Sequence, residues 1–402
     1  MNKALEGVTI LDFSHLLQGP FATQLLADMG ANVIKIERSG TGDMFRSMTF
    51  FAKWVGGSES PSFLAWNRNK RSIALNLKSR KVHQIIMDMA KKADVVVQNF
   101  RPGVLARLGY GYEDFKAVNP AIIYCSGSGY GEAGPYVDRP GQDMLIQGLS
   151  GLVVNTGRGD AAPVPAGAGM ADQIGAMNMV YGILSALYYR EKTGKGQKIE
   201  VNLLAGMLAH LGQEYVAVLN LGEDFVRPNS GIGHPGMQAP FGIYETRDGS
   251  YVSIAMSPFK TLYETLEAPE LAVYDDLKTL FQKRDEVWEK VNEETRKYDR
   301  EDLLTRLLAA DIWCAGVNDI RSASEDPQVK FAEMITAYEH PTAGTVRVVA
   351  PAVKMSETPA TIERPAPLVG QHGREILTEF GFSRDAIAEL EQSGDLTVQD
   401  AE

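Results

Sequence analysis

The 402-residue sequence is poor in the residues that build cross-links and metal sites. It contains two cysteines, Cys125 and Cys314, which are far apart and form no CxxC pair. Neither a disulfide framework nor a zinc site is therefore expected, and each cysteine is expected to act as a small hydrophobe. The six histidines are scattered without metal-ligand spacing. We expect no bound metal.

Long apolar segments and a basic charge balance are also missing. No run reaches the roughly 18 apolar residues that can span a bilayer. The N-terminal MNKALEGVTILDF lacks the apolar core and cleavage site of a signal peptide, so we expect a cytoplasmic protein with no membrane partner. A formal net charge of −11 argues against a nucleic-acid partner, because phosphate backbones bind to basic faces.

Common nucleotide-binding and hydrolase motifs are absent. The first predicted strand leads into SHLLQGP instead of GxGxxG, and no GxxxxGK[ST], GxSxG or HExxH occurs. The later pattern Gly129-x-Gly131-x-x-Gly134 is followed at once by Pro135 and not by a good helix start. We therefore do not interpret it as a dinucleotide site.

The first third of the chain alternates predicted strands and helices. Apolar runs predict strands at 8–13, 32–37, 73–77, 95–97 and 121–125, and helical spacing follows Pro20 and spans 82–89. This alternation is typical of an α/β fold with a parallel sheet. Ligands of such sheets bind beyond the carboxyl ends of the strands. The site is therefore expected in the loops SHLLQG, RSGTGD, NFRPG and SGSGYGEAG.

A change of composition marks a second region. No glycine occurs between Gly249 and Gly316, and this interval carries charged amphipathic helical patterns. Asp248-Gly249 predicts the turn of a hairpin just before it. A strand is expected within 345–353 and helix in the last thirty residues. We expect a large domain at 1–224, a small domain at 225–330 and a return to the large domain at 331–402, within a chain long enough for about two or three domains.

Basic residues follow several of the predicted strands. Arg38, Lys78, Arg101 and Arg107 are placed to converge on a small polyanion despite the acidic total charge. Coenzyme A fits such a ledge, with Phe100 offering a face for adenine. The alternative is that each is a solvated surface charge with an ordinary ion pair.

One carboxylate, Asp172, ends a stretch rich in glycine, alanine and proline and precedes an apolar helix that runs to Arg190 and stops by Gly194. Helix-start amides and the helix dipole favour an anionic group there, which suits a nucleophilic carboxylate. The local pattern by itself favours the other interpretation, an ordinary aspartate N-cap.

Four blocks of sequence together resemble the class III CoA-transferases of the CaiB/BaiF superfamily, which include formyl-CoA transferase and carnitine CoA-transferase. The blocks are VTILDFSHLLQGPFATQLLADMGANVIKIER, NKRSIALNLK, DVVVQNFRPGVLARLGYGYEDFKAVNPAIIYCSGSGYG and TGKGQKIEVNLLAGML. The resemblance implies a Rossmann-like large domain whose parallel sheet is built from both chain ends, a smaller α+β domain, and an interlocked homodimer. It also implies that Asp172, which ends the Gly-Ala-x-x-x-Asp pattern begun by Gly167, is the nucleophile.

The same resemblance implies that CoA or acyl-CoA is a substrate and that no cofactor is tightly bound. It places the CoA contacts at His15, Gln18, Arg38, Leu75, Lys78, Asn99, Phe100, Arg101, Arg107, Tyr130 and Gly131. Two features depart from formyl-CoA transferase. Leu17 stands where that enzyme has an assisting glutamine, with Gln18 beside it, and the nearest counterpart of its run of four glycines is SGIGHPG at 230–236.

The activity implied is transfer of CoA from an acyl-CoA donor to a small free carboxylic acid, through an aspartyl mixed anhydride and an aspartyl-CoA thioester. One alternative is a 2-methylacyl-CoA racemase, which resembles the chain over the same blocks. Racemases carry a G-H-D tripeptide where this chain has Gly141-Gln142-Asp143, and glutamine is no proton-transfer base near neutral pH. A non-catalytic acyl-CoA-binding protein is the other alternative.

Overall fold

The computed structural model describes residues 3–399, which fall into two compact units. The first takes in the described residues up to Ile146, Gly169–His210 and those from Pro327 onward. The second comprises Gln147–Ala168 and Leu211–Asp326. The second unit thus includes segments around 147–168 and 211–224 that no change of composition marks. The expected domain boundaries after 224 and after 330 stay predictions.

A seven-stranded sheet forms the centre of the first unit, with strand order β12-β3-β2-β1-β4-β5-β6. Six of its strands are parallel, and they are β1 (Thr9–Asp12), β2 (Asn32–Arg38), β3 (Arg71–Leu75), β4 (Val95–Gln98), β5 (Ile123–Ser128) and β6 (Lys198–Asn202). The predicted α/β class with a parallel-dominated sheet is confirmed.

The edges of this sheet differ from expectation. β3 begins at Arg71 and ends at Leu75, two residues before the predicted span. The C-terminal chain adds β12 (Leu396–Thr397) beside β3, but antiparallel, so the contribution of the second chain end is not a parallel strand. β6 carries charges on a largely solvated edge, and its sequence therefore lacks the apolar run that marks the inner strands.

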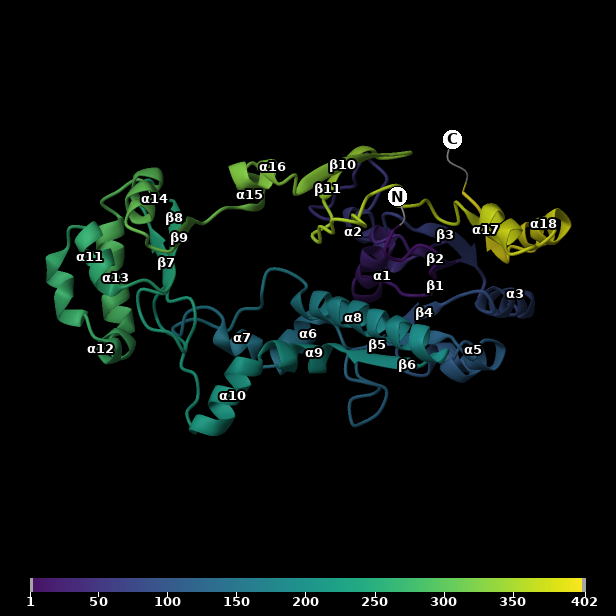
Figure 1. Cartoon of the computed structure of the whole chain (residues 1–402), viewed down its shortest axis with the longest axis horizontal. Helices are drawn as coiled ribbons and strands as arrows, with labels where there is room; N and C mark the ends of the chain where they lie inside the picture. The colour runs from purple at the N-terminus through teal and green to yellow at the C-terminus, as the bar shows by residue number, and fades with distance from the viewer. Residues whose placement is uncertain (1–2, 400–402) are drawn as a thin grey trace. The chain divides into compact units, whose positions relative to one another are not determined.

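Helices cover both faces of the sheet (Figure 1). Ile10, Val33 and Val95 pack on one face with α1 (Gln18–Asp28) and α8 (Met170–Thr193). Their neighbours Leu11, Ile34 and Val96 belong to the core of the opposite face. That face is covered by α3 (Arg80–Ala90), α5 (Tyr112–Val118), α17 (Gly373–Glu379) and α18 (Arg384–Gln392). Burial of both faces explains the continuous apolar runs of the inner strands.

Shorter elements complete the first unit. They are η1 (Met44–Ser47), α2 (Pro61–Trp66), α4 (Val104–Arg107), α9 (Leu203–His210), α16 (Pro327–Phe331) and the antiparallel pair β10 (Ile335–His340) and β11 (Gly344–Val349). α6 (Asp143–Leu149) begins in the first unit and ends in the second. β11 confirms the strand expected within 345–353 as far as Val349.

The second unit has its own core, which includes Tyr244, Val252 and Leu303. The predicted hairpin is present, since β7 pairs antiparallel with β8 and Gly249 in the turn has φ +73°. The elements of this unit are α7 (Leu152–Asn155), α10 (Gly212–Leu221), β7 (Gly242–Glu245), β8 (Tyr251–Ile254), α11 (Phe259–Thr265), η2 (Pro269–Tyr274), α12 (Leu277–Gln282), α13 (Arg284–Thr295), α14 (Arg300–Ala309), β9 (Cys314–Gly316) and α15 (Ile320–Ser324). Between residues 3 and 399, no helix combines the length and apolarity that crossing a membrane requires.

Candidate active site

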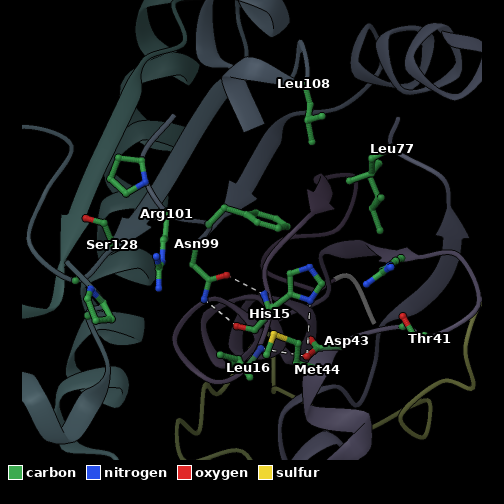
Figure 2. A pocket seen from close by; sticks show the side chains of 18 of the residues that line it. His15, Leu16, Thr41, Asp43, Met44, Leu77, Asn99, Arg101, Leu108 and Ser128 are labelled. Atoms are coloured by element: carbon green, nitrogen blue, oxygen red, sulfur yellow. Dashed lines mark hydrogen bonds and ion pairs between the residues drawn. The ribbon is translucent and has the colours of Figure 1, made fainter. Parts of the chain in front are cut away.

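A cavity of about 1210 Å³ lies in the first unit where β1 to β5 end. All four loops singled out in the sequence contribute to its lining, and the side chains around it are drawn in Figure 2. The cavity is large enough for an elongated ligand, because small-molecule sites usually have volumes of about 300–1,000 Å³.

Nine of the sequence-predicted contact residues line this cavity. They are His15, Arg38, Leu75, Lys78, Asn99, Phe100, Arg101, Tyr130 and Gly131. Three predicted site residues, Gln18, Arg107 and Asp172, are not among the lining residues.

Gln18, the first residue of α1, is buried beneath the loops. A Cβ added at Gly127 would lie 2.6 Å from its Oε1, and one added at Gly175 would lie 2.7 Å from its Nε2. The two glycines therefore make room for this amide. Its Nε2 has no hydrogen-bond partner among the described residues. Arg107 ends α4 and folds back toward Gly103.

Asp172 is the third residue of α8 and not its N-cap. The helix begins at Met170, and Gly169 holds the capping position without a side-chain hydrogen bond. The N-cap interpretation is therefore wrong, because the helix begins earlier than the glycine- and alanine-rich sequence indicates. A Cβ at Gly169 would lie 3.2 Å from Leu17 Cδ1, so the absence of a side chain there brings the start of α8 close to the first loop.

The carboxyl group of Asp172 has an unusual environment. The backbone amide of Asp172 donates to Asp143 Oδ1 over 3.1 Å. Asp143 directly follows Gln142, which lines the cavity. Burial, reinforced by the negative charge of Asp143, raises the pKa of Asp172 to about 7. Strongly shifted carboxyl groups are common at catalytic sites.

The cavity wall carries four basic side chains. Three were predicted, namely Arg38, Lys78 and Arg101, and the fourth is Arg139. Arg139 follows no predicted strand, which is why strand-end reasoning missed it. Its guanidinium lies 3.8 Å from the centre of the Tyr136 ring, a cation–π contact that orients it.

A contact between two glycines, which the sequence did not predict, shapes the part of the cavity wall formed by residues 129 and 141. Gly129 and Gly141 both line the cavity, and a Cβ on Gly141 would lie 2.4 Å from Gly129 Cα. The two backbone segments can approach this closely only because neither residue has a side chain. The first glycine of the Gly129-x-Gly131-x-x-Gly134 pattern thus has a packing reason.

Buried charges lie beneath the cavity. Lys35 and Lys70 are fully buried, and their ammonium groups lie 2.7 Å from Asp43 Oδ2 and 3.1 Å from Asp12 Oδ2. Burial raises the pKa of Asp43, but the charge of Lys35 and the interactions with His15 together outweigh burial and hold that pKa below its ordinary value. Burial lowers the pKa of Lys70 to about 8. Buried pairs of this kind seldom add net stability, so their place beneath a cavity suggests a role in shaping it.

Two further observations on the described part of the chain concern ligand binding outside this cavity. No group of three or more His, Cys, Asp or Glu residues there is placed to hold a metal ion. A second cavity, of about 790 Å³, lies within the second unit and includes His234. The His234 Nε2 atom lies 3.2 Å from Glu214 Oε1.

Comparisons with known proteins show which family this chain resembles. The sequence model of CoA-transferase family III matches residues 5–373. A succinyl-CoA:glutarate CoA-transferase of Homo sapiens is 37% identical, and the alignment covers 98% of this chain and 90% of that protein. A formyl-CoA:oxalate CoA-transferase of Rhodopseudomonas palustris (strain BisA53) is 32% identical, and the alignment covers 98% of this chain and 98% of that protein. The crystal structure of a CAIB/BAIF family protein from Brucella suis superposes with a TM-score of 0.83 at 31% identity, covering 94% of this chain and 100% of that one.

Proposed function

The chain belongs to CoA-transferase family III and is therefore a CoA-transferase, and we propose that it transfers CoA between carboxylic acids through covalent intermediates on Asp172. The observation that carries the proposal is the position of Asp172. This half-buried residue donates its backbone amide to Asp143, and Asp143 directly follows Gln142 in the wall of a cavity large enough for CoA.

Asp172 acts first as a nucleophile. One carboxylate oxygen attacks the thioester carbonyl of the donor acyl-CoA, the carbon–sulfur bond breaks, and an aspartyl mixed anhydride and CoA thiolate form. The thiolate then attacks the aspartyl carbonyl, releases the donor acid as its carboxylate and leaves an aspartyl-CoA thioester. This covalent route divides one difficult exchange into easier steps.

The acceptor acid completes the reaction by the same steps in reverse. Its carboxylate attacks the aspartyl-CoA carbonyl and expels the thiolate, which attacks the acyl carbon of the new anhydride to give the product thioester and free Asp172. Thioester energy is conserved, so no ATP is consumed. Amides of the first turn of α8 are proposed to stabilise the oxyanions.

The proposed CoA contacts divide by chemistry. Arg38, Lys78 and Arg101 are assigned to the phosphates, and Phe100 to the adenine. The remaining assignments are His15, Gln18, Leu75, Asn99, Arg107, Tyr130 and Gly131. Gln18 and Arg107 do not line the cavity. Their assignment therefore means that they act on CoA indirectly, by supporting the residues that do line the cavity.

The acid substrates are proposed to be dicarboxylates. The names of the two relatives above mention oxalate, glutarate and a succinyl thioester, whose parent acids have two carboxyl groups, and a formyl thioester, whose parent acid has one. Leu17 and the missing run of glycines weigh against the formyl-CoA and oxalate pair. Succinyl-CoA with glutarate is therefore the first pair to test.

The chain is further proposed to work as a cytoplasmic homodimer. Large exposed apolar side chains support association, including Tyr181 and Tyr188 on α8 and, within the second unit, Val216 and Leu219 on α10. Light scattering at nanomolar concentration tests the dimer, and a monomer there would contradict it.

The decisive experiment combines mass spectrometry with Asp172→Ala. The wild-type protein, mixed with acyl-CoAs and free acids in heavy water, is expected to form a new CoA thioester without α-deuteration. With succinyl-CoA alone, the peptide containing Asp172 should gain the mass of CoA less water. The variant should bind CoA but transfer nothing. Deuteration without acid exchange would favour the racemase, and binding without any chemistry would favour a non-catalytic protein.

A further inference from the structure

The loop after β1, Ser14–Leu16, is held almost entirely by side chains that bind its backbone. Its three successive amides donate to Asp12 Oδ1 at 2.9 Å, Asn99 Oδ1 at 2.8 Å and Asp43 Oδ1 at 3.2 Å. Its first two carbonyls accept from Lys35 Nζ at 2.9 Å and Asn99 Nδ2 at 2.8 Å. Figure 2 shows the paired bonds of Asn99 beside His15. The loop therefore depends on distant elements for its shape.

Leu16 adopts a conformation that leucine disfavours. Its φ is +66°, in the left-handed region, where a side chain with a Cβ is strained. Such a conformation persists only where the surroundings enforce it. The amide of Leu16 is bonded to Asp43, and Leu16 lines the cavity. Asp43 is thus the group that secures the strained residue.

Asp43 also organises the second loop of the cavity. Its Oδ1 accepts from the amide of Phe45 at 2.9 Å and caps η1, and its own amide donates to Glu37 Oε2 at 2.8 Å. Its Oδ2 pairs with the buried ammonium of Lys35. A single buried carboxylate therefore connects β2, the loop before η1 and the loop after β1.

We propose that Asp43 is a positioning residue for CoA: it fastens the strained Leu16 to the second loop and keeps the cavity wall in the shape that binds the coenzyme. The inference rests on the proposed function, because it takes CoA as the ligand of this cavity. Asp43 is among the residues that line the cavity, but it is only 1% exposed and is ion-paired with Lys35. A carboxylate also repels an anionic ligand, so in this proposal Asp43 acts through the loop and not by binding CoA directly.

A double-mutant cycle of Asp43 with Leu16 tests this role by calorimetric titration of CoA itself. Asp43→Ala, which removes the acceptor of the Leu16 amide, is made together with Lys35→Met, so that no unpaired cation is left buried. Lys35→Met alone is the reference that accounts for the lost bond from Lys35 to the Ser14 carbonyl, and thermal denaturation confirms folding. The Asp43→Ala/Lys35→Met pair should weaken CoA binding on the order of tenfold, as expected when charge-assisted bonds are lost. In a Leu16→Gly background the same pair should weaken binding less than about threefold, because glycine adopts positive φ without support.

The outcomes separate the possibilities. A folded Asp43→Ala/Lys35→Met protein that binds CoA as tightly as wild type would overturn the inference, and so would an equal loss in both Leu16 backgrounds. Asp319→Ala is the matched control, because Asp319 also caps a short helix, α15, by accepting from the Ser322 amide. This variant should leave CoA affinity unchanged. Failure of the wild-type protein to bind CoA would instead overturn the proposed function.

Discussion

The amide of Asp172 donates to Oδ1 of Asp143 across 3.1 Å, so two acidic residues are held together at the first turn of α8. Burial and the charge of Asp143 raise the pKa of Asp172 to about 7. Only the ionised carboxylate can attack a thioester. In the proposed mechanism, the pair thus determines the pH range in which the nucleophile is present.

The rate should therefore depend on pH in a defined direction. We expect kcat/KM to fall as the pH drops below about 7, as Asp172 becomes protonated. Asp143→Asn keeps an oxygen for the Asp172 amide but removes the charge, so the acid limb should move to lower pH. pH–rate profiles with the exposed Asp138→Asn as a control check this. An unmoved limb in Asp143→Asn would contradict the assignment.

The raised pKa of Asp172 also predicts that the folded protein loses stability at high pH. Because folding raises the pKa of Asp172, the folded state binds a proton more tightly than the unfolded state, and the associated stability is lost as pH rises from about 4 through about 7. Asp172→Asn should therefore raise the melting temperature at about pH 8 and have little effect near pH 4. Melting curves at both pH values test this, and a pH-independent difference would argue against it.

The basic side chains of the cavity should act on the phosphates of CoA. Replacing Arg101 with glutamine is expected to weaken CoA binding about tenfold while leaving a pantetheine thioester, which lacks the nucleotide, unaffected. Lys91→Gln, on the surface beside Asp88, provides a control with no change for either ligand. Equal losses for CoA and the pantetheine thioester would show that Arg101 supports the fold and not the phosphates.

The contact between Gly129 and Gly141 in the cavity wall can be tested by adding a side chain there. Gly141→Ala would place a Cβ 2.4 Å from the Gly129 backbone, so the loops must separate and CoA affinity should fall severalfold. Gly148→Ala meets nothing within 4 Å inside α6 and should be neutral or stabilise the helix by up to about 1 kcal/mol. Titration and melting curves distinguish the two. An unaffected Gly141→Ala would mean that the loops can part freely.

Much of the first unit could be predicted from the sequence. Inner strands such as β4 are buried on both faces, and this leaves an apolar run that is easy to find. The edge strands β6 and β12 leave no such signal, because one is largely solvated and the other has two residues. The loops of the site followed from strand order, since parallel strands end at one edge.

The sequence by itself determined the family and the α/β class and predicted residues for the chemistry, because apolar periodicity and the order of motifs are local properties of the chain. Tertiary structure alone decided which of those residues meet. It placed Asp143 against Asp172, Arg139 in the cavity wall and Asp43 beneath Leu16, contacts between segments far apart in sequence. It also supplied the raised pKa of Asp172, because burial and a neighbouring charge exist only once the chain has folded.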